Sequence, residues 1–165
     1  MWRSEYSKKV DMSADAKIEE LGLKLPPAPQ PMGVYKLIVI IGNMAYLSGH
    51  GPVLDDGSMT TGRVGDDIDL NGGYAAARQT GLALLSTLQA NLGSLDRVVR
   101  GVKMLGLVNC TNDFAKQPHV INGCSDLFGE VFGLENGVGA RSAVGTNALP
   151  GSIPVEIEMI VEISS

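Results

Sequence analysis

Apolar and polar residues alternate most regularly near the end of the chain. Every second residue from Val155 to Ile163 is apolar, and the positions between them include Glu156, Glu158 and Glu162. Because successive side chains of a β-strand point to opposite faces, this alternation predicts a strand with one buried face and one acidic face.

Two other segments have the three- and four-residue spacing of amphipathic helices. The first covers 74–92 and is followed by Gly93, which favours the left-handed conformation of a helix C-cap. The second covers 118–132. Further strands are predicted by apolar, β-branched runs at 35–41, 44–48, 97–109 and 141–149. The order β-β-α-β-α-β-β predicts an α+β domain with a mixed sheet and two main helices on one face.

The beginning of the chain has a different pattern. Ser13 is placed to cap a short helix that ends near residue 21, and prolines between 26 and 31 require an extended connector. We therefore expect an N-terminal extension over 1–31 and a single domain over 32–165. Residues 1–11 lack the apolar core of a secretory signal, and no apolar run reaches the roughly 20 residues of a membrane span. The sequence thus predicts a cytoplasmic protein without membrane contact, with an organellar address left open.

Composition narrows the classes of partner. Of 165 residues, 44% are hydrophobic and 19% charged, and the net charge is −5. Without a cluster of Lys and Arg, this acidic balance disfavours a nucleic-acid partner. Cys110, Cys124, His50 and His119 have no zinc-binding spacing, so no metal site is expected and both thiols are predicted to be packed. A lone histidine such as His50 is more often a satisfied polar residue than a catalyst.

The candidate chemistry centres on Arg141 and on Glu156 and Glu158 of the last predicted strand. A guanidinium presents a fixed fork of donors that matches a carboxylate, although Arg141 could equally pair with a glutamate of the last strand. The glutamates of this strand belong either to a solvated face or to a subunit interface or cleft, where one carboxylate can hold and activate a water molecule. Asn122 lies within the second helix, where it is either exposed or reaches a ligand.

Several short motifs, in this order and spacing, resemble the RidA (YjgF) family of reactive-intermediate deaminases from about residue 33 to 163. They are Gly33-Val34-Tyr35, Gly42-Asn43-Met44-Ala45-Tyr46-Leu47-Ser48-Gly49, Asn112-Asp113-Phe114, Asn122, Ala140-Arg141-Ser142-Ala143-Val144, Leu149-Pro150 and Pro154-Val155-Glu156-Ile157-Glu158. The resemblance implies a chorismate-mutase-like α+β fold, a homotrimer with clefts between subunits, and no metal or organic cofactor. It also implies hydrolysis of enamines and imines to 2-oxo acids and ammonia.

The resemblance assigns roles by position. Arg141 matches the carboxylate-binding arginine, and Glu156 matches the glutamate associated with the attacking water. Residues at pocket or substrate-contacting positions are Tyr35, Ser48, Asn122 and the backbone of Ala143. The departures are Ala143 where cysteine is frequent, His50 where glutamine is common, Ser125 where an aromatic residue is common, and an unusually long loop over 52–72. They leave the preferred substrate open.

The sequence therefore predicts a deaminase of 2-imino and enamine acids whose ligands are small imino and 2-oxo acids. The alternative is a non-catalytic module of the same fold that binds a small carboxylate, such as a 2-oxo acid, as a sensor or regulator. A ribonuclease or translation inhibitor is a third interpretation. It is disfavoured by the acidic charge and by the lack of a histidine acid–base pair.

Overall fold

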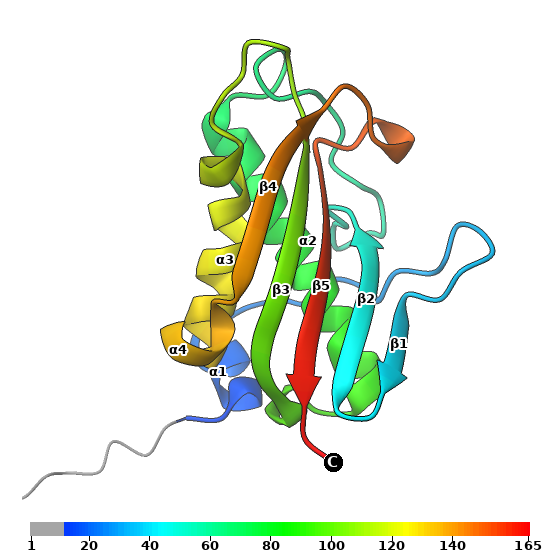
Figure 1. The fold of residues 1–165 in the computed structure, drawn as a ribbon, viewed down its shortest axis with the longest axis vertical. Helices are drawn as coiled ribbons and strands as arrows, with labels where there is room; N and C mark the ends of the chain where they lie inside the picture. Colours follow the sequence, from blue (N-terminus) through cyan, green and yellow to red (C-terminus); the bar gives the residue numbers. More distant parts are fainter. Residues whose placement is uncertain (1–11) are drawn as a thin grey trace, which may run out of the picture.

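A five-stranded mixed sheet forms the centre of the computed structural model, which describes residues 12–165 (Figure 1). The strands lie in the order β1-β2-β5-β3-β4, and only β3 and β4 run parallel to each other. Their bounds are β1 (Ile38–Ile41), β2 (Met44–His50), β3 (Val98–Asn109), β4 (Ala140–Thr146) and β5 (Val155–Ile163). The predicted α+β fold with a mixed sheet is confirmed.

Two long helices cover one face of this sheet, as predicted, and lie behind it in Figure 1. They are α2 (Leu70–Leu92) and α3 (Gln117–Phe132), accompanied by the short helices α1 (Ala14–Glu20) and α4 (Leu134–Gly137) and by 3₁₀ turns at Leu95–Arg97 and Pro150–Ser152. No helix within residues 12–165 combines the length and apolar character that crossing a membrane requires.

The core fills the space between the sheet and the two long helices. Leu84 and Leu88 of α2 and Phe128 of α3 are fully buried, as are Val155 and Ile157 of β5. The alternation predicted for β5 is therefore confirmed, because its apolar residues face the helices and its glutamates face away.

The first long helix begins one turn earlier than its apolar pattern predicts. The pattern indicates a start at residue 74, whereas α2 begins at Leu70. The Asp69 carboxylate accounts for the difference, because it accepts a hydrogen bond from the backbone N–H of Gly72 at 2.7 Å. This cap stabilises the first turn although Gly72 and Gly73 are poor helix formers.

Strand ends also differ from the predicted ones. The run at 35–41 pairs only from Ile38 onward, because the residues before it belong to a loop that projects beyond the sheet edge (Figure 1). The run at 141–149 ends as a strand at Thr146, at the level where its only neighbour, β3, also ends. Strand β2 continues to His50. Pairing with a neighbour decides these ends, and the pattern of one segment does not contain that information.

The described part of the predicted N-terminal extension packs against the domain. Ala14 and Ile18 of α1 join the core, and the Asp15 carboxylate accepts a hydrogen bond from the backbone N–H of Leu95 at 3.0 Å. The connector that follows accepts a hydrogen bond at Pro26 O from Ser86 Oγ of α2, at 2.6 Å. The prediction that residues 1–11 contain no secretory signal lies outside the described residues.

The close approach of α2 and α3 depends on Gly123. A Cβ atom at this position would lie 2.0 Å from Tyr74 O and 2.9 Å from Arg78 N, both backbone atoms of α2. Backbone atoms of a packed helix cannot move without separating the two helices, so we expect Gly123→Ala to lower the free energy of unfolding by at least ~2 kcal/mol. Urea unfolding would measure this.

Gly129, in the same helix, provides the matched control. A Cβ atom there would meet only side chains, with Leu134 Cδ2 nearest at 3.0 Å. Because Leu134 is exposed and able to move, Gly129→Ala should change stability by less than ~1 kcal/mol. Equal losses for the two variants would contradict the proposed packing constraint.

Candidate active site

A cavity of about 750 Å³ lies where β2 ends beside the beginning of β5. Its floor is the end of β2, from Ser48 to Gly51, together with Glu156 of β5. Its walls come from the projecting loop before β1 that contains Tyr35, from the long loop after β2, and from the segment before β5 that includes Ile153. The structure thus brings Tyr35, Ser48 and Glu156, three of the predicted site residues, to one cavity.

Glu156 occupies space that a side chain at Gly49 would otherwise fill. A Cβ atom on Gly49 would lie 2.1 Å from Glu156 Oε1. The carboxylate is half-buried, and its pKa is raised, first by burial and then by the neighbouring charge of Glu158. A carboxylate with a raised pKa is a stronger base once ionised, which suits it to remove a proton from water.

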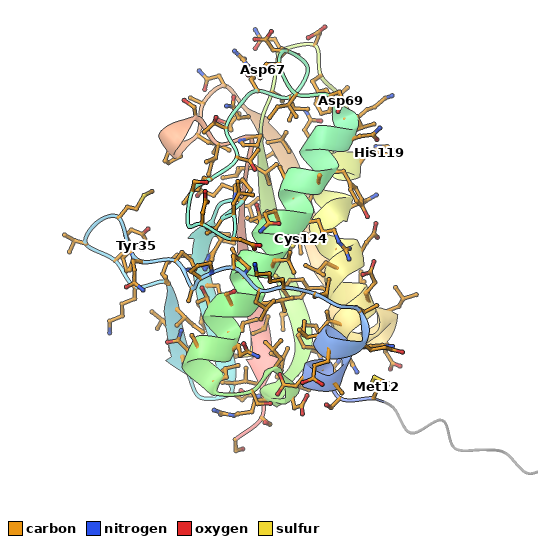
Figure 2. All side chains as sticks on the ribbon, turned by 180° about the vertical axis from the view of Figure 1, so that it is seen from behind. Met12, Tyr35, Asp67, Asp69, His119 and Cys124 are labelled. Atoms are coloured by element: carbon orange, nitrogen blue, oxygen red, sulfur yellow. The ribbon has the colours of Figure 1, made fainter. Side chains whose placement is uncertain are left out.

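Tyr35 and Ser48 are linked through the loop before β1. Ser48 Oγ donates a hydrogen bond to Lys36 O at 2.6 Å, so this hydroxyl holds the backbone next to Tyr35. The Tyr35 hydroxyl accepts a hydrogen bond from Met32 N at 3.3 Å. Figure 2 shows Tyr35 in the projecting loop at the sheet edge. Ser48 therefore positions the cavity wall that carries Tyr35.

His50 also borders the cavity, but its imidazole is committed to the fold. It is buried, with Nδ1 2.6 Å from Ser48 O and Nε2 2.8 Å from Thr87 Oγ1. Since a carbonyl only accepts, Nδ1 carries the proton and Nε2 accepts from Thr87. Burial lowers the pKa of His50 and favours the neutral ring. The interpretation of His50 as a satisfied polar residue is confirmed.

Arg141 belongs to a second group of residues, between β4 and α3. Its Nη1 donates to Asn122 Oδ1 at 2.8 Å and to Ser125 Oγ at 3.0 Å, and its Nη2 donates to Pro118 O at 3.3 Å. All three acceptors are neutral. Among the described residues Arg141 forms no ion pair with an acidic side chain, so the predicted alternative of a salt bridge to a glutamate is wrong.

The sequence pointed to Arg141 and Asn122 separately, and the structure joins them. Asn122 is half-buried and supports the guanidinium, and Ser125, which the sequence marks only as a departure from the family pattern, supports the same group. Asn122 and Ser125 are three residues apart, so they lie on the same face of α3. This spacing points to a shared partner only once Arg141 is known to face α3. Ala143 follows Arg141 by two residues and packs against the core.

The two groups lie on opposite faces of the sheet. Arg141 reaches α3 and therefore lies on the helix-covered face, whereas Glu156 lies between the buried Val155 and Ile157 and so points to the other face. Strand β3 separates β5 from β4, which sets their backbones about 10 Å apart. One copy of the chain therefore does not bring Arg141 and Glu156 into one cavity.

Both cysteines are free and buried, as predicted for packed thiols. Burial raises the pKa of Cys124 far above its ordinary value, which keeps this thiol protonated. Figure 2 places Cys124 between the two long helices. In the part of the chain that the structure describes, no three His, Cys, Asp or Glu side chains gather as metal ligands.

The five-stranded mixed sheet with both long helices on one face is the architecture of a chorismate-mutase-like α+β protein. Residues 15–158 match the family model described as "YjgF/chorismate_mutase-like, putative endoribonuclease". The chain therefore belongs to the YjgF/RidA family.

Individual relatives are similar over most of their length. Protein TCP17 of Trypanosoma cruzi is 42% identical over 150 residues, which are 91% of this chain and 94% of that protein. A 2-iminobutanoate/2-iminopropanoate deaminase of Dermatophagoides farinae is 32% identical over 142 residues, or 86% of this chain and 94% of the relative. The crystal structure of Atu1372 from Agrobacterium tumefaciens, a protein with unknown function, has a TM-score of 0.83 at 37% identity and covers 92% of this chain and 94% of its own.

The raised pKa of Glu156 predicts how stability depends on pH. A pKa that is higher in the folded state means that folding disfavours ionisation, so the contribution of Glu156 is lost as pH rises through the raised pKa. Glu156→Gln removes that ionisation. We expect its melting temperature to equal that of the wild type near pH 4 and to exceed it near pH 8, as scanning calorimetry would show.

Glu135→Gln is the control, because Glu135 is exposed on α4. It should leave the pH dependence unchanged. A gain for Glu156→Gln that is larger near pH 4 than near pH 8 would contradict the buried, reluctantly ionised state of Glu156.

Proposed function

We propose that this protein hydrolyses 2-imino acids and their enamine tautomers to 2-oxo acids and ammonia. The observation that carries the proposal is the Arg141 guanidinium, which is held on α3 by three neutral oxygen atoms. Its positive charge is thus oriented but not neutralised, which suits a substrate carboxylate. The 32% identity to a protein named 2-iminobutanoate/2-iminopropanoate deaminase supports this reaction class.

We further propose that the site forms between copies of the chain, in a homotrimer. Because Arg141 and Glu156 lie on opposite faces of one sheet, a site that contains both takes them from two subunits. The uncovered sheet face also carries large apolar side chains in solvent, since Val39, Tyr46 and Val144 are 43%, 42% and 44% exposed. Such a surface is typical of one that a partner covers.

The mechanism needs positioning and one proton transfer. Arg141 of one subunit binds the substrate carboxylate, and Glu156 of another accepts a proton from a water molecule. The resulting hydroxide adds to the imine carbon, and the nitrogen takes up the proton. In the tetrahedral carbinolamine the new hydroxyl group gives its proton, by way of Glu156, to the amino group, the C–N bond breaks, and ammonia leaves as the C=O bond of the 2-oxo acid forms. General acid–base catalysis of this kind contributes about 10²–10⁴-fold, and Tyr35, Ser48 and the backbone of Ala143 complete the pocket.

The ribonuclease activity in the family description is less well supported. Both ring nitrogens of His50 are engaged within the fold, so this histidine is not available as an acid–base group. His119 is exposed on α3, on the outer side of the molecule in Figure 2, and does not line the cavity. A net charge of −5 also repels a phosphate backbone.

Removing the guanidinium tests the proposed function. We expect Arg141→Ala to lower kcat/KM for 2-iminopropanoate, generated in situ by an amino-acid oxidase, by about 100-fold. Hydrogen bonds to a charged group contribute up to about 3 kcal/mol, and each 1.36 kcal/mol is a factor of ten in rate. Lys116→Ala removes a cation from the exposed start of α3 and should keep wild-type activity. A folded Arg141→Ala protein with undiminished activity would exclude the proposed role.

A wild-type protein that binds 2-oxo acids but turns over no imine would instead favour the non-catalytic, carboxylate-binding alternative. Calorimetry with pyruvate, run beside the activity assay, separates these two functions because binding requires Arg141 but no water activation.

Mixing two inactive variants tests whether the site is shared. Arg141→Ala chains retain Glu156, and Glu156→Gln chains retain Arg141. If each site takes Arg141 from one subunit and Glu156 from its neighbour, each of these two subunits carries the intact residue with a chance of one half in an equal mixture. About a quarter of the sites in random trimers are then intact. We expect unfolding and joint refolding of the two variants to restore about that fraction of wild-type activity. A mixture that stays inactive would place both residues in one subunit's site.

A further inference from the structure

The loop after β2 forms a fixed hairpin beside the cavity. Val53 and Met59 form an antiparallel bridge within it, and Leu54 N donates to Ser58 O at 2.8 Å. The side-chain amide of Gln79 on α2 donates a hydrogen bond to Val53 O, which ties the hairpin to the helix. The loop that the sequence marks as unusually long therefore has a defined structure.

This hairpin supplies an apolar wall. Val53 and Met59 both line the cavity, together with Ile153 from the segment before β5. A Cβ atom on Gly51 would lie 2.9 Å from Ile153 Cδ1 and 3.1 Å from Met59 Sδ. The ends of both side chains therefore lie above Gly51, where the floor of the cavity carries no side chain.

The polar and apolar ends of the cavity share one short piece of backbone. Glu156 lies over Gly49, and Met59 with Ile153 lies over Gly51, two residues further and thus about 7 Å away. His50, between the two glycines, turns its ring away from this surface to Thr87 of α2. A ligand that lies next to Glu156 can therefore extend along this short stretch of backbone toward the apolar wall.

The proposed function indicates which part of a substrate would face that wall. An imine carbon bears a nitrogen, a carboxylate and a side chain. Under the proposed function the carboxylate belongs to Arg141 and the nitrogen leaves as ammonia, so the substrate side chain is the group directed along the floor. At roughly 30 Å³ for each heavy atom, the six heavy atoms of 2-iminopropanoate take up under about 200 Å³, a small part of the cavity of about 750 Å³.

We propose that this site prefers 2-imino acids with a large apolar side chain, such as the imine derived from leucine, and that Met59 determines this specificity. The proposal rests on the proposed function. An alanine-derived substrate places one methyl group near the wall, whereas a leucine-derived one places three further carbon atoms against Val53, Met59 and Ile153. One methylene in an apolar pocket changes kcat/KM by about 10- to 200-fold.

Two imines generated by an amino-acid oxidase from leucine and from alanine test this preference. We expect the wild type to have a kcat/KM at least tenfold higher for the leucine-derived imine. Met59→Trp fills the apolar end and should lower kcat/KM for that substrate at least tenfold, while the value for the alanine-derived imine stays within about threefold. Met59→Gln keeps the size of the side chain but makes it polar. It should lower the ratio of kcat/KM for the leucine-derived imine to kcat/KM for the alanine-derived imine, although it takes up no extra space.

Leu54 offers a matched control, because it lies in the same loop, is exposed and does not line the cavity. Leu54→Trp and Leu54→Gln should keep the wild-type ratio of the two substrates. The proposal is overturned if the wild type prefers the alanine-derived imine, or if the Met59 variants lower both activities equally.

Absence of turnover for both imines would overturn the proposed function. The selectivity of the cavity could then still be tested by binding. In that case calorimetry would compare 4-methyl-2-oxopentanoate with pyruvate. Affinity at least tenfold higher for the larger acid in the wild type, and lost in Met59→Gln, supports the apolar subsite. Equal affinities overturn it.

Discussion

Strand β5 is hydrogen-bonded on both sides, to β2 and to β3. Its side chains can therefore point only to one face of the sheet or to the other. Within residues 12–165, helices cover only one of those faces (Figure 1). The apolar residues of β5 have to point toward the helices, because burying apolar surface provides most of the stability of the fold. Glu156 and Glu158 are thereby forced to the other face. The location of the candidate base is a consequence of how the core is built.

The same constraint separates the two charged residues of the candidate site. Arg141 lies on an edge strand and extends along the covered face to α3, where Asn122 and Ser125 accept its hydrogen bonds. Glu156 lies on the open face, where partial burial and Glu158 raise its pKa. Among the described residues Arg141 has no acidic partner, and its charge is opposite to that of Glu156 in its ionised form. Within one chain the sheet keeps them apart, so the proposed chemistry requires the proposed assembly of more than one chain.

Glycine has a specific role at three points of this arrangement. Gly123 lets the helix that supports Arg141 approach α2, because any side chain there would overlap backbone atoms. Gly49 leaves room for the Glu156 carboxylate, and Gly51 leaves room for Met59 and Ile153. Helix spacing, the position of the base and the width of the cavity thus each depend on a missing side chain.

Local pattern alone was enough to predict the alternation of β5, the two long helices, the order of the elements and the fold class, because burial imposes periods of two and of about 3.6 residues on any segment. The residues themselves made Arg141 and the glutamates of β5 candidates, and the resemblance selected Glu156 among those glutamates. Tertiary structure decided what lies between distant segments: the pairing that ends β1 and β4, the neutral partners that Arg141 has instead of a glutamate, and the two bonds that occupy His50. It also decided that Met59 and Ile153 both lie over Gly51. Contacts between residues far apart in sequence leave no period in either segment, so only the folded chain reveals them.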